Sequence, residues 1–363
     1  MPPQEQRLND LVFSTLDNDD RGNDALDAFV RAHPDGNAYQ LAAWRRAVAD
    51  AYGYAGRVLV ANKGSELAGI LPLCEFARPL SRPRWISLPF CDLGGPLALS
   101  DVVAEALAAR ARHDLGTRGA AGLELRCSAM GTADEAGLDG RKVRMLLALP
   151  ESAAALMQSY PPKLRSQVRK AEKNGLTSAV VTGAAAVAEF YDVYSRNMRR
   201  LGSPPHSRAW FEAVQRHYGA AGDMFLVIVR HEGKAVGAGW VLLCGDKAVI
   251  PWASTLAEFN SLAPNMLLYW AIQSHLCERG VRQFDFGRST FGEGTYKFKK
   301  QWGALPVALD WKEWDAQGVA AIAAPAAKAG GSSLRPLIES AWRKLPLGVA
   351  NGLGGRLRRY ITL

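Results

Sequence analysis

The residues best suited to chemistry gather near the end of the chain, beginning with the run FDFGR at 284–288. In an extended strand successive side chains point to opposite faces, so the two phenylalanines face the core and Asp285 faces the other way. A carboxylate at the end of a strand, beside Arg288, can orient or deprotonate an attacking amine. The alternative is a structural salt bridge between Asp285 and a nearby arginine.

The run continues as GEGTYKFKKQWG at 292–303. Glycines allow a backbone to approach a ligand closely. Lysines and Tyr296 add hydrogen-bond donors for a phosphate, or for a carbonyl oxygen that develops negative charge. The glycine spacing matches neither the dinucleotide-binding nor the P-loop pattern, which argues against an ATPase. We therefore predict a glycine- and lysine-rich loop after a buried strand, able to meet a carbonyl or a phosphate.

A basic cluster lies on a predicted helix earlier in the chain. Arg165, Arg169 and Lys173 recur four residues apart and share one helical face, whereas Lys163 and Lys170 share an adjacent face. Such a face repels itself unless anions neutralise it. Phosphates of a nucleotide, of coenzyme A or of tRNA would do so. The alternative is a solvated surface helix.

Four further residues are candidates for a substrate cleft. His206 lies in a proline-rich loop and has a pKa range suited to acid–base work, although a loop histidine can also be merely exposed. Asp92, in the turn DLGG, can face a cleft between the two halves or belong to a turn without function. Asn265, at the start of a predicted helix, and Trp302 complete the set.

The sequence also argues against several classes of chemistry. It contains no Ser-His-Asp or Cys-His series and no HExxH motif, and its five cysteines are widely spaced without a CxxC pair. Hydrolase and metalloenzyme functions, and a disulfide framework, are therefore poorly supported. We predict reduced thiols, no metal and no tightly bound cofactor.

The elements that position these residues follow the same order twice: helix, hairpin strands, helix, strand. This repetition predicts an internal duplication into two mixed α/β units, 1–150 and 151–315. In the first half the predicted elements are helix 41–51, strands 57–61, 67–73 and 83–89, helix 101–115, and strands 123–127 and 142–149. In the second half they are helices 152–175 (interrupted at the prolines), 187–201 and 209–218, strands 224–230, 235–244 and 247–253, helix 266–280, and strands 283–286 and 308–311.

Residues 316–363 are predicted to form an alanine- and glycine-rich linker followed by a basic amphipathic tail. Such a tail can lie on an anionic membrane, or it can pack back onto the globular body. The net charge of +9 favours an anionic partner. A polar, acidic N-terminus and the lack of an apolar run of ~18–20 residues predict a cytoplasmic protein, peripheral at the inner membrane face if the tail binds there.

Several of these runs together resemble FemAB-like proteins of the group associated with bacterial exosortase/PEP-CTERM systems. The runs are 163–176, 201–206, 284–289 and 294–303, and the resemblance covers about 35–315. It implies two tandem GNAT-type acyltransferase domains and a role in envelope or exopolysaccharide assembly. In the family's peptidoglycan branch a Phe-Lys pair lies near the acyl ester of the tRNA, and Phe298 and Lys299 match that pair.

The resemblance implies an acyltransferase or aminoacyltransferase whose amine acceptor attacks the donor carbonyl directly. Lys299 would stabilise the oxyanion, Asp285 would orient the amine, and the basic helical face with Arg288 and Tyr296 would hold donor phosphates. The donor, a co-substrate, is aminoacyl-tRNA or acyl-CoA, although the usual GNAT pyrophosphate loop pattern and the charged coiled-coil arm of the peptidoglycan branch are both absent.

Two alternatives remain open: an acyl-CoA-dependent N-acetyltransferase, and a non-catalytic GNAT-fold module that binds an anionic glycan, a lipid precursor or RNA. The partners expected are an anionic small-molecule or lipid-linked precursor, tRNA, and a membrane surface through the tail. Without a helix-turn-helix or zinc signature, DNA is not expected.

Overall fold

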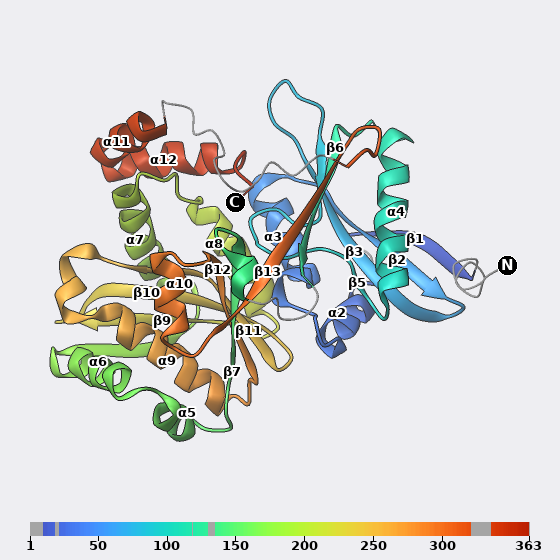
Figure 1. The fold of residues 1–363 in the computed structure, drawn as a ribbon. Coiled ribbons are helices and arrows are strands. Elements are labelled where there is room, and N and C mark those ends of the chain that lie inside the picture. Colours follow the sequence, from blue (N-terminus) through green and yellow to red (C-terminus); the bar gives the residue numbers. More distant parts are fainter. Residues whose placement is uncertain (1–9, 19–21, 118, 130–134, 321–334, 363) are drawn as a thin grey trace. The chain divides into compact units, whose positions relative to one another are not determined.

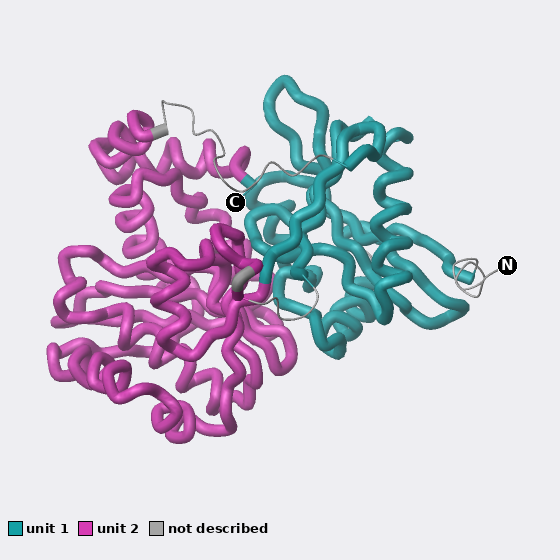
Figure 2. Tube along the Cα trace, viewed as in Figure 1, with its two compact units in different colours: residues 1–133, 308–326, 362–363 teal, residues 134–307, 327–361 magenta. Residues whose placement is uncertain are grey.

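The computed structural model describes residues 10–18, 22–117, 119–129, 135–320 and 335–362, and the chain divides into two compact units (Figures 1 and 2). Unit 1 comprises 1–133, 308–326 and 362–363, and unit 2 comprises 134–307 and 327–361. The mixed α/β architecture is confirmed in both units. The boundary between the units lies at 133/134 rather than at the predicted residue 150, because β7 (Lys142–Ala148) pairs with β12 (Gln283–Thr290). Residues 308–326 return to unit 1, where β13 (Leu305–Asp315) pairs with β6 (Gly122–Ser128).

Unit 1 is built on a largely antiparallel sheet in the order β1-β2-β3-β4-β6-β13, in which only β4 and β6 are parallel and β5 pairs with β3. The strands are β1 (Leu11–Asp17), β2 (Gly56–Lys63), β3 (Glu66–Phe76), β4 (Arg84–Ile86), β5 (Leu97–Ala98), β6 (Gly122–Ser128) and β13 (Leu305–Asp315). The helices of unit 1 are α2 (Asn23–Ala32), η1 (Ala38–Gln40), α3 (Ala42–Tyr52) and α4 (Asp101–Thr117). The short helix η2 (Glu135–Leu138) follows in the sequence and belongs to unit 2.

The core of unit 1 lies between α4 and the sheet. Leu107, Ala111 and Leu115 recur four residues apart on α4 and are buried against Leu123 and Leu125 of β6. Strand β1 and helix α2 were not predicted from the sequence. Both elements are short: β1 has seven residues, none of them fully buried, and α2 has ten, of which Asn23, Leu26 and Val30 are buried.

Unit 2 contains the second sheet, in the order β7-β12-β11-β10-β9-β8, with β11 and β12 parallel and the other pairs antiparallel. The strands are β7 (Lys142–Ala148), β8 (Leu176–Val181), β9 (Met224–His231), β10 (Lys234–Cys244), β11 (Lys247–Thr255) and β12 (Gln283–Thr290). The helices are α5 (Ala153–Ser159), α6 (Pro162–Lys173), α7 (Ala184–Leu201), α8 (Arg208–Gly219), η3 (Ala257–Leu262), α9 (Pro264–Glu278), α10 (Gly294–Lys300), α11 (Arg335–Lys344) and α12 (Leu347–Arg358).

Helices cover both faces of this second sheet (Figure 1). On β10, a Cβ at Gly239 would lie against Leu268 and Ile272 of α9. The next residue, Trp240, points to the opposite face and contacts Phe190 of α7. The sheet is therefore buried on both sides, which explains the nearly continuous apolar sequences of β9 and β10.

Two parts of unit 2 differ from the prediction. Strand β8 was not predicted, and the glycine- and lysine-rich run forms helix α10 rather than a loop. The helix is stabilised by burial of Tyr296 and Lys299, three residues apart on one face. Three lysines in its last turn also suit the negative end of the helix dipole. Gly292 and Gly294 lie at the start of this helix, where they permit the turn out of β12, and Gly303 follows its end.

The tail returns to unit 2, where α11 and α12 both pack on α7. Gly354 is required for this packing, because a Cβ at that position would overlap the ring of Pro205. The guanidinium of Arg199 on α7 donates a hydrogen bond of 3.0 Å to the carbonyl of Leu345, which lies between the two tail helices. Among the described residues, none of the helices has the length and apolar character needed to span a bilayer.

Candidate active site

The sheet of unit 2 opens into a fork between its two parallel strands. β11 and β12 pair only from Lys247 with Gln283 to Val249 with Asp285. Beyond that point each strand has a β-bulge, in which it uses one residue more than its neighbour between two paired positions. In β11 three steps, from Val249 to Trp252, lie opposite two steps of β10. Similarly, β12 advances three residues from Asp285 while β7 advances two. Such bulges bend and twist a strand, so the two strands diverge where Pro251 and Gly287 lie.

Asp285 lies at the base of the fork, buried within an ion pair. Its Oδ2 atom is 3.0 Å from both Nε and Nη2 of Arg144 on β7. Its Oδ1 atom accepts a hydrogen bond of 2.8 Å from the backbone N–H of Gly287. The two phenylalanines beside Asp285 are buried, as predicted. Asp285 therefore makes the structural salt bridge that the sequence offered as the alternative to a catalytic role. Its contacts with Arg144 and with the N–H of Gly287 fix the shape of the bulge.

Lys299 reaches from α10 to the same bulge. Its ammonium donates hydrogen bonds of 2.9 Å to the carbonyl of Gly287 and 2.8 Å to that of Arg288. The side chain is 8% exposed, so these charge-assisted bonds are screened little by water. The carboxylate of Asp285 thus binds an N–H of the segment 287–288, and the ammonium of Lys299 binds its two carbonyls. Both predicted residues lie at the fork.

Gly287 adopts a left-handed conformation, with φ of +73°. We expect Gly287→Ala to cost about 1–2 kcal/mol of stability and also to reduce turnover, because the bulge is displaced. Gly64, in a hairpin turn of unit 1, has φ of +61° with open space around it, so Gly64→Ala is a matched control. Urea unfolding should show similar losses for both variants. Equal activity losses would contradict a special role of the bulge.

Aromatic side chains from α9, β12 and the segment before α6 pack around α10. The ring of Tyr269 on α9 stacks on Phe286 with centroids 5.4 Å apart and contacts Phe298 at 5.1 Å. Trp302 packs on Tyr160 at 5.3 Å. Phe298 and Trp302, both predicted site residues, therefore belong to the packing that positions Lys299. The indole N–H of Trp302 is buried, and no described residue accepts a hydrogen bond from it.

Three other predicted donors lie around α10 and β12. Tyr296 is buried against Phe291, and its hydroxyl is 3.4 Å from a carboxylate oxygen of Glu135. Lys300, adjacent to the buried Lys299, donates to the same carboxylate at 3.0 Å, and this hydrogen bond raises its pKa. Arg288 is half-buried and faces Arg144 across the β7–β12 ladder. The hydroxyl of Ser289, beside it, is buried without a hydrogen-bond partner among the described residues, a signal the sequence did not provide.

The basic cluster lies on α6, which packs on α9 through a buried stripe of Leu164, Val168 and Ala171. Its cationic side chains point outward. Four of them are exposed and one is half-buried, and none makes an ion pair with a described acidic residue; they are Lys163, Arg169, Lys170, Lys173 and the half-buried Arg165. Asn265 is exposed at the start of α9.

His206 is buried rather than exposed, and it ties the tail to the body of unit 2. Its Nε2 atom accepts a hydrogen bond of 3.2 Å from Nε of Arg358 on α12, and its ring stacks on Trp210. Burial, and secondarily the Arg358 charge, lower its pKa well below the usual value. A neutral, buried ring that accepts from arginine connects two segments; it is not positioned as an exposed acid or base.

This histidine predicts a pH dependence of stability. Below the usual histidine pKa of about 6.5 the unfolded chain binds a proton that folded His206 does not. The free energy of unfolding should therefore fall as the pH drops below that value, by up to about 1.4 kcal/mol per pH unit. Urea titrations between pH 7 and 5 should show a smaller decrease in His206→Gln. The exposed His113 provides the control, since His113→Gln should keep the wild-type slope.

Asp92 belongs to unit 1, whereas the other predicted site residues all belong to unit 2. It is half-buried, and its carbonyl accepts a hydrogen bond of 3.1 Å from the indole of Trp311. The backbone N–H groups of Gly94 and Gly95 both donate to the carbonyl of Arg126. These bonds hold the DLGG segment as an ordered turn on β6 and β13.

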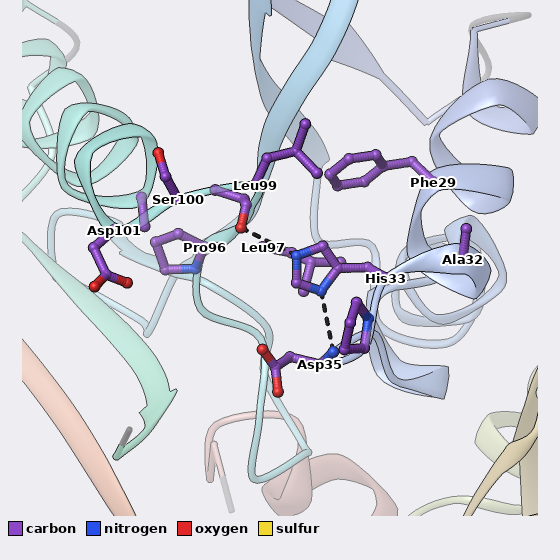
Figure 3. Close-up of a pocket in the computed structure, with 12 residues that line it drawn as sticks. Phe29, Ala32, His33, Asp35, Pro96, Leu97, Leu99, Ser100 and Asp101 are labelled. Atoms are coloured by element: carbon purple, nitrogen blue, oxygen red, sulfur yellow. Dashed lines mark hydrogen bonds between the residues drawn. The ribbon is translucent and has the colours of Figure 1, made fainter. Parts of the chain in front are cut away.

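Unit 1 also contains a cavity of about 560 Å³ between the end of α2 and the start of α4 (Figure 3). His33 lies in its wall with both ring nitrogens engaged: Nδ1 accepts from the Asp35 N–H at 3.1 Å, and Nε2 is 3.0 Å from the carbonyl of Ala98. The charged residues that line the cavity are Asp35 and Asp101. A cavity whose charges are acidic disfavours a phosphate, so unit 1 has no obvious site here for a coenzyme A pyrophosphate.

Burial raises the pKa of four of the five thiols, those of Cys74, Cys91, Cys127 and Cys277. All five cysteines are free, and burial raises the pKa of Cys74 to about 12 and that of Cys127 to about 11. A thiol with so high a pKa contains little of the reactive thiolate. Among the described residues, no group of three or more His, Cys, Asp and Glu side chains is placed to hold a metal ion.

Residues 160–300, which include the fork, match the family described as acetyltransferase (GNAT) domain. The part of unit 2 that contains the fork is thus similar to GNAT acetyltransferase domains. The match extends from the end of α5 to α10, so all the predicted residues of unit 2 except Trp302 lie within it. No curated protein matches the chain by sequence.

Solved structures extend this likeness to both units. The crystal structure of FemX has a TM-score of 0.66 at 16% identity, over 84% of this chain and 98% of that one. A tandem GNAT protein from the clavulanic acid biosynthesis pathway has a TM-score of 0.52 at 14% identity, over 84% and 98%. The structure of L-PGS from Bacillus licheniformis has a TM-score of 0.50 at 12% identity, over 88% and 96%. At these identities the likeness is one of fold, and it confirms the predicted tandem GNAT-like architecture.

Proposed function

We propose that this protein transfers an acyl or aminoacyl group to an amine of a cell-envelope or exopolysaccharide precursor, with the GNAT domain as its catalytic unit. The observation that carries the proposal is the fork between β11 and β12 inside that domain. The names of two of the structural neighbours, FemX and L-PGS, favour aminoacyl transfer within this class. The exosortase/PEP-CTERM association rests on the sequence resemblance alone.

The fork suits an extended donor. Past Val249 the edge of β11 that faced β12 is no longer paired with it. An extended chain that contains amides can bind such an edge as an additional strand, through main-chain hydrogen bonds. The buried bulge at Gly287, held by Asp285 and Lys299, then forms a rigid wall beside the donor carbonyl. Rigid support of this kind keeps reacting groups within the narrow geometry that transfer requires.

The reaction consists of direct attack. The neutral amine nitrogen of the acceptor forms a bond to the donor carbonyl carbon, and a tetrahedral oxyanion develops. The bond to the leaving group then breaks: C–S in a thioester, or C–O in an aminoacyl ester. The amine loses one proton and the leaving group gains one, so the step balances without an oxidant. The ammonium of Lys299 supplies positive charge close to the oxyanion, and the raised thiol pKa values favour direct transfer over an acyl-cysteine intermediate.

Both donors remain within the proposal. The connection between β11 and α9 contains no glycine, and α9 begins with Pro264, which lacks a backbone N–H. A helix start with fewer N–H donors binds a pyrophosphate less well, which favours an aminoacyl ester. The match to the acetyltransferase (GNAT) domain favours acyl-CoA instead, so an acyl-CoA-dependent N-acetyltransferase is the second candidate.

The test is a donor-by-acceptor screen with the full chain. Acetyl-CoA and mixed aminoacyl-tRNA are each incubated with UDP-linked and lipid-linked precursors that bear a free amine, and products are identified by mass spectrometry. Formation of a new amide that requires the protein supports the proposal, and the active donor separates its two forms. Thermal stabilisation by a precursor with no product from either donor would overturn it in favour of a binding module.

A further inference from the structure

The two tail helices bury one face against unit 2 and keep a large apolar surface on the other. Five large aliphatic side chains on α11 and α12 are 43–65% exposed: Leu337, Ile338, Val349, Leu353 and Leu357. Single exposed aliphatic residues are ordinary on protein surfaces, but so many within two short helices are not. We call these five residues, together with the basic residues Arg343, Lys344 and Arg356 beside them, the tail surface.

The spacing on α12 shows that the three exposed aliphatic residues of this helix share one face. Ala350 and Gly354 are buried, four residues apart, and Gly354 meets Pro205. Val349, Leu353 and Leu357 have the same four-residue spacing. Val349 and Leu353 each precede one of the buried residues by one position, and Leu357 follows Gly354 by three. The three therefore form a second stripe beside the buried one, and this stripe is exposed. The inner stripe is sufficient to seat the helix. The outer stripe has therefore no packing role among the described residues.

The charge of the tail is mostly positive. Residues 335–362 contain five arginines and one lysine against a single glutamate, Glu339, which lies 3.7 Å from Arg343. Arg343, Lys344 and Arg356 are exposed next to the aliphatic side chains. Apolar residues flanked by basic residues are the pattern of helices that lie in the interface of an anionic bilayer.

The end of α7 continues this surface. Leu201, its last residue, is 46% exposed, and Arg200 is exposed beside it. A cavity of about 190 Å³ opens at this end, and its charged lining residues are Arg196, Arg199, Arg200 and Glu258. Arg199 also bonds the carbonyl of Leu345, so the cavity borders the tail. Because three guanidinium groups outnumber the single carboxylate of Glu258, the lining of this cavity favours a phosphate ester, which is the polar group of a phospholipid.

We propose that the tail surface lies on an anionic lipid bilayer, with its aliphatic stripe in the headgroup–acyl boundary and its basic residues on lipid phosphates. A second copy of the chain is a poorer occupant, because a symmetric contact would place Arg343, Lys344 and Arg356 against themselves. RNA would account for the charges but would leave the aliphatic stripe in water. The proposal is independent of which acyl donor the fork uses.

Vesicle flotation with the full-length protein tests this proposal. The vesicles contain phosphatidylcholine with or without phosphatidylglycerol. We expect binding only to the anionic vesicles, weakened by added salt. Leu353→Gln/Leu357→Gln should reduce the bound fraction by about tenfold, because apolar burial and lipid charge act together. Leu80→Gln/Leu99→Gln is the matched control, since both leucines are more exposed and lie in unit 1.

The charge variant Lys344→Gln/Arg356→Gln keeps the test decisive if the apolar variant does not fold. It should also lose binding to anionic vesicles while its melting temperature stays unchanged. Equal binding by wild type and both tail variants, or no binding to anionic vesicles, would overturn the proposal. Two further results would overturn it. The first is a dimer in analytical ultracentrifugation that the apolar variant abolishes, and the second is binding to RNA by the tail without any dependence of vesicle binding on phosphatidylglycerol.

Discussion

Asp285→Asn is expected to lower the free energy of unfolding by about 3 kcal/mol and to remove most of the turnover. The substitution leaves the Arg144 guanidinium buried without its counter-charge, and a broken buried pair costs more than the intact pair contributes. Because the same carboxylate accepts the N–H of Gly287, the bulge beside the donor should also shift. Chemical denaturation and the product assay measure the two effects separately.

A double variant separates stability from activity. Asp285→Leu with Arg144→Met replaces the whole pair by apolar side chains, which is often neutral for stability. We expect its stability to recover while its activity does not. If activity returned together with stability, the pair would be only a structural support. Glu189→Gln, in a more exposed pair with Arg230 on β9, is the control and should cost no more than about 1 kcal/mol.

Lys299→Met is expected to have the second large effect. Removing the ammonium leaves the carbonyls of Gly287 and Arg288 without their donor in a buried place, at a cost of about 2–3 kcal/mol. Turnover should fall about 100-fold if the same charge stabilises the oxyanion. Lys297→Met, on the exposed side of the same helix, should change neither quantity.

The kinetic constants distinguish the two roles of Lys299. A loss confined to kcat, with KM and the pH profile unchanged, indicates charge that acts in the transition state. A fall in melting temperature with kcat retained at low temperature would contradict the oxyanion role and leave Lys299 as a residue that only positions the bulge.

Local patterns were sufficient for much of the fold of unit 2. The alternation around Asp285 correctly placed both phenylalanines in the core, and the helical spacing correctly located α7, α8 and α9. The partner of Asp285 was beyond such patterns. Arg144 is 141 residues away, and only the pairing of β7 with β12 brings it close. A charged residue inside an otherwise apolar strand was the available signal that it has a buried partner.

The other differences have the same origin in tertiary contacts. The GEGTYKFKK run reads as a loop by its glycines, but burial of Tyr296 and Lys299 makes it a helix. His206 reads as an exposed loop residue, but α12 covers it. In both places the decisive neighbour lies outside any local window of the sequence, so propensity alone gives the wrong structure.

The order of the strands in unit 1 bears on how the protein is made. β6 pairs with β13 from Ser128 with Leu309 to Gly122 with Asp315, although unit 2 separates them in the sequence. During translation the edge of β6 therefore stays without this partner until the ribosome has passed residue 315. The carbonyl of Thr362, which accepts from Phe90 and Arg126, arrives later still. Unit 1 contains both the first and the last residues to be synthesised. While the chain is still on the ribosome, unit 1 therefore has an unpaired strand edge, which chaperones would need to shield from aggregation.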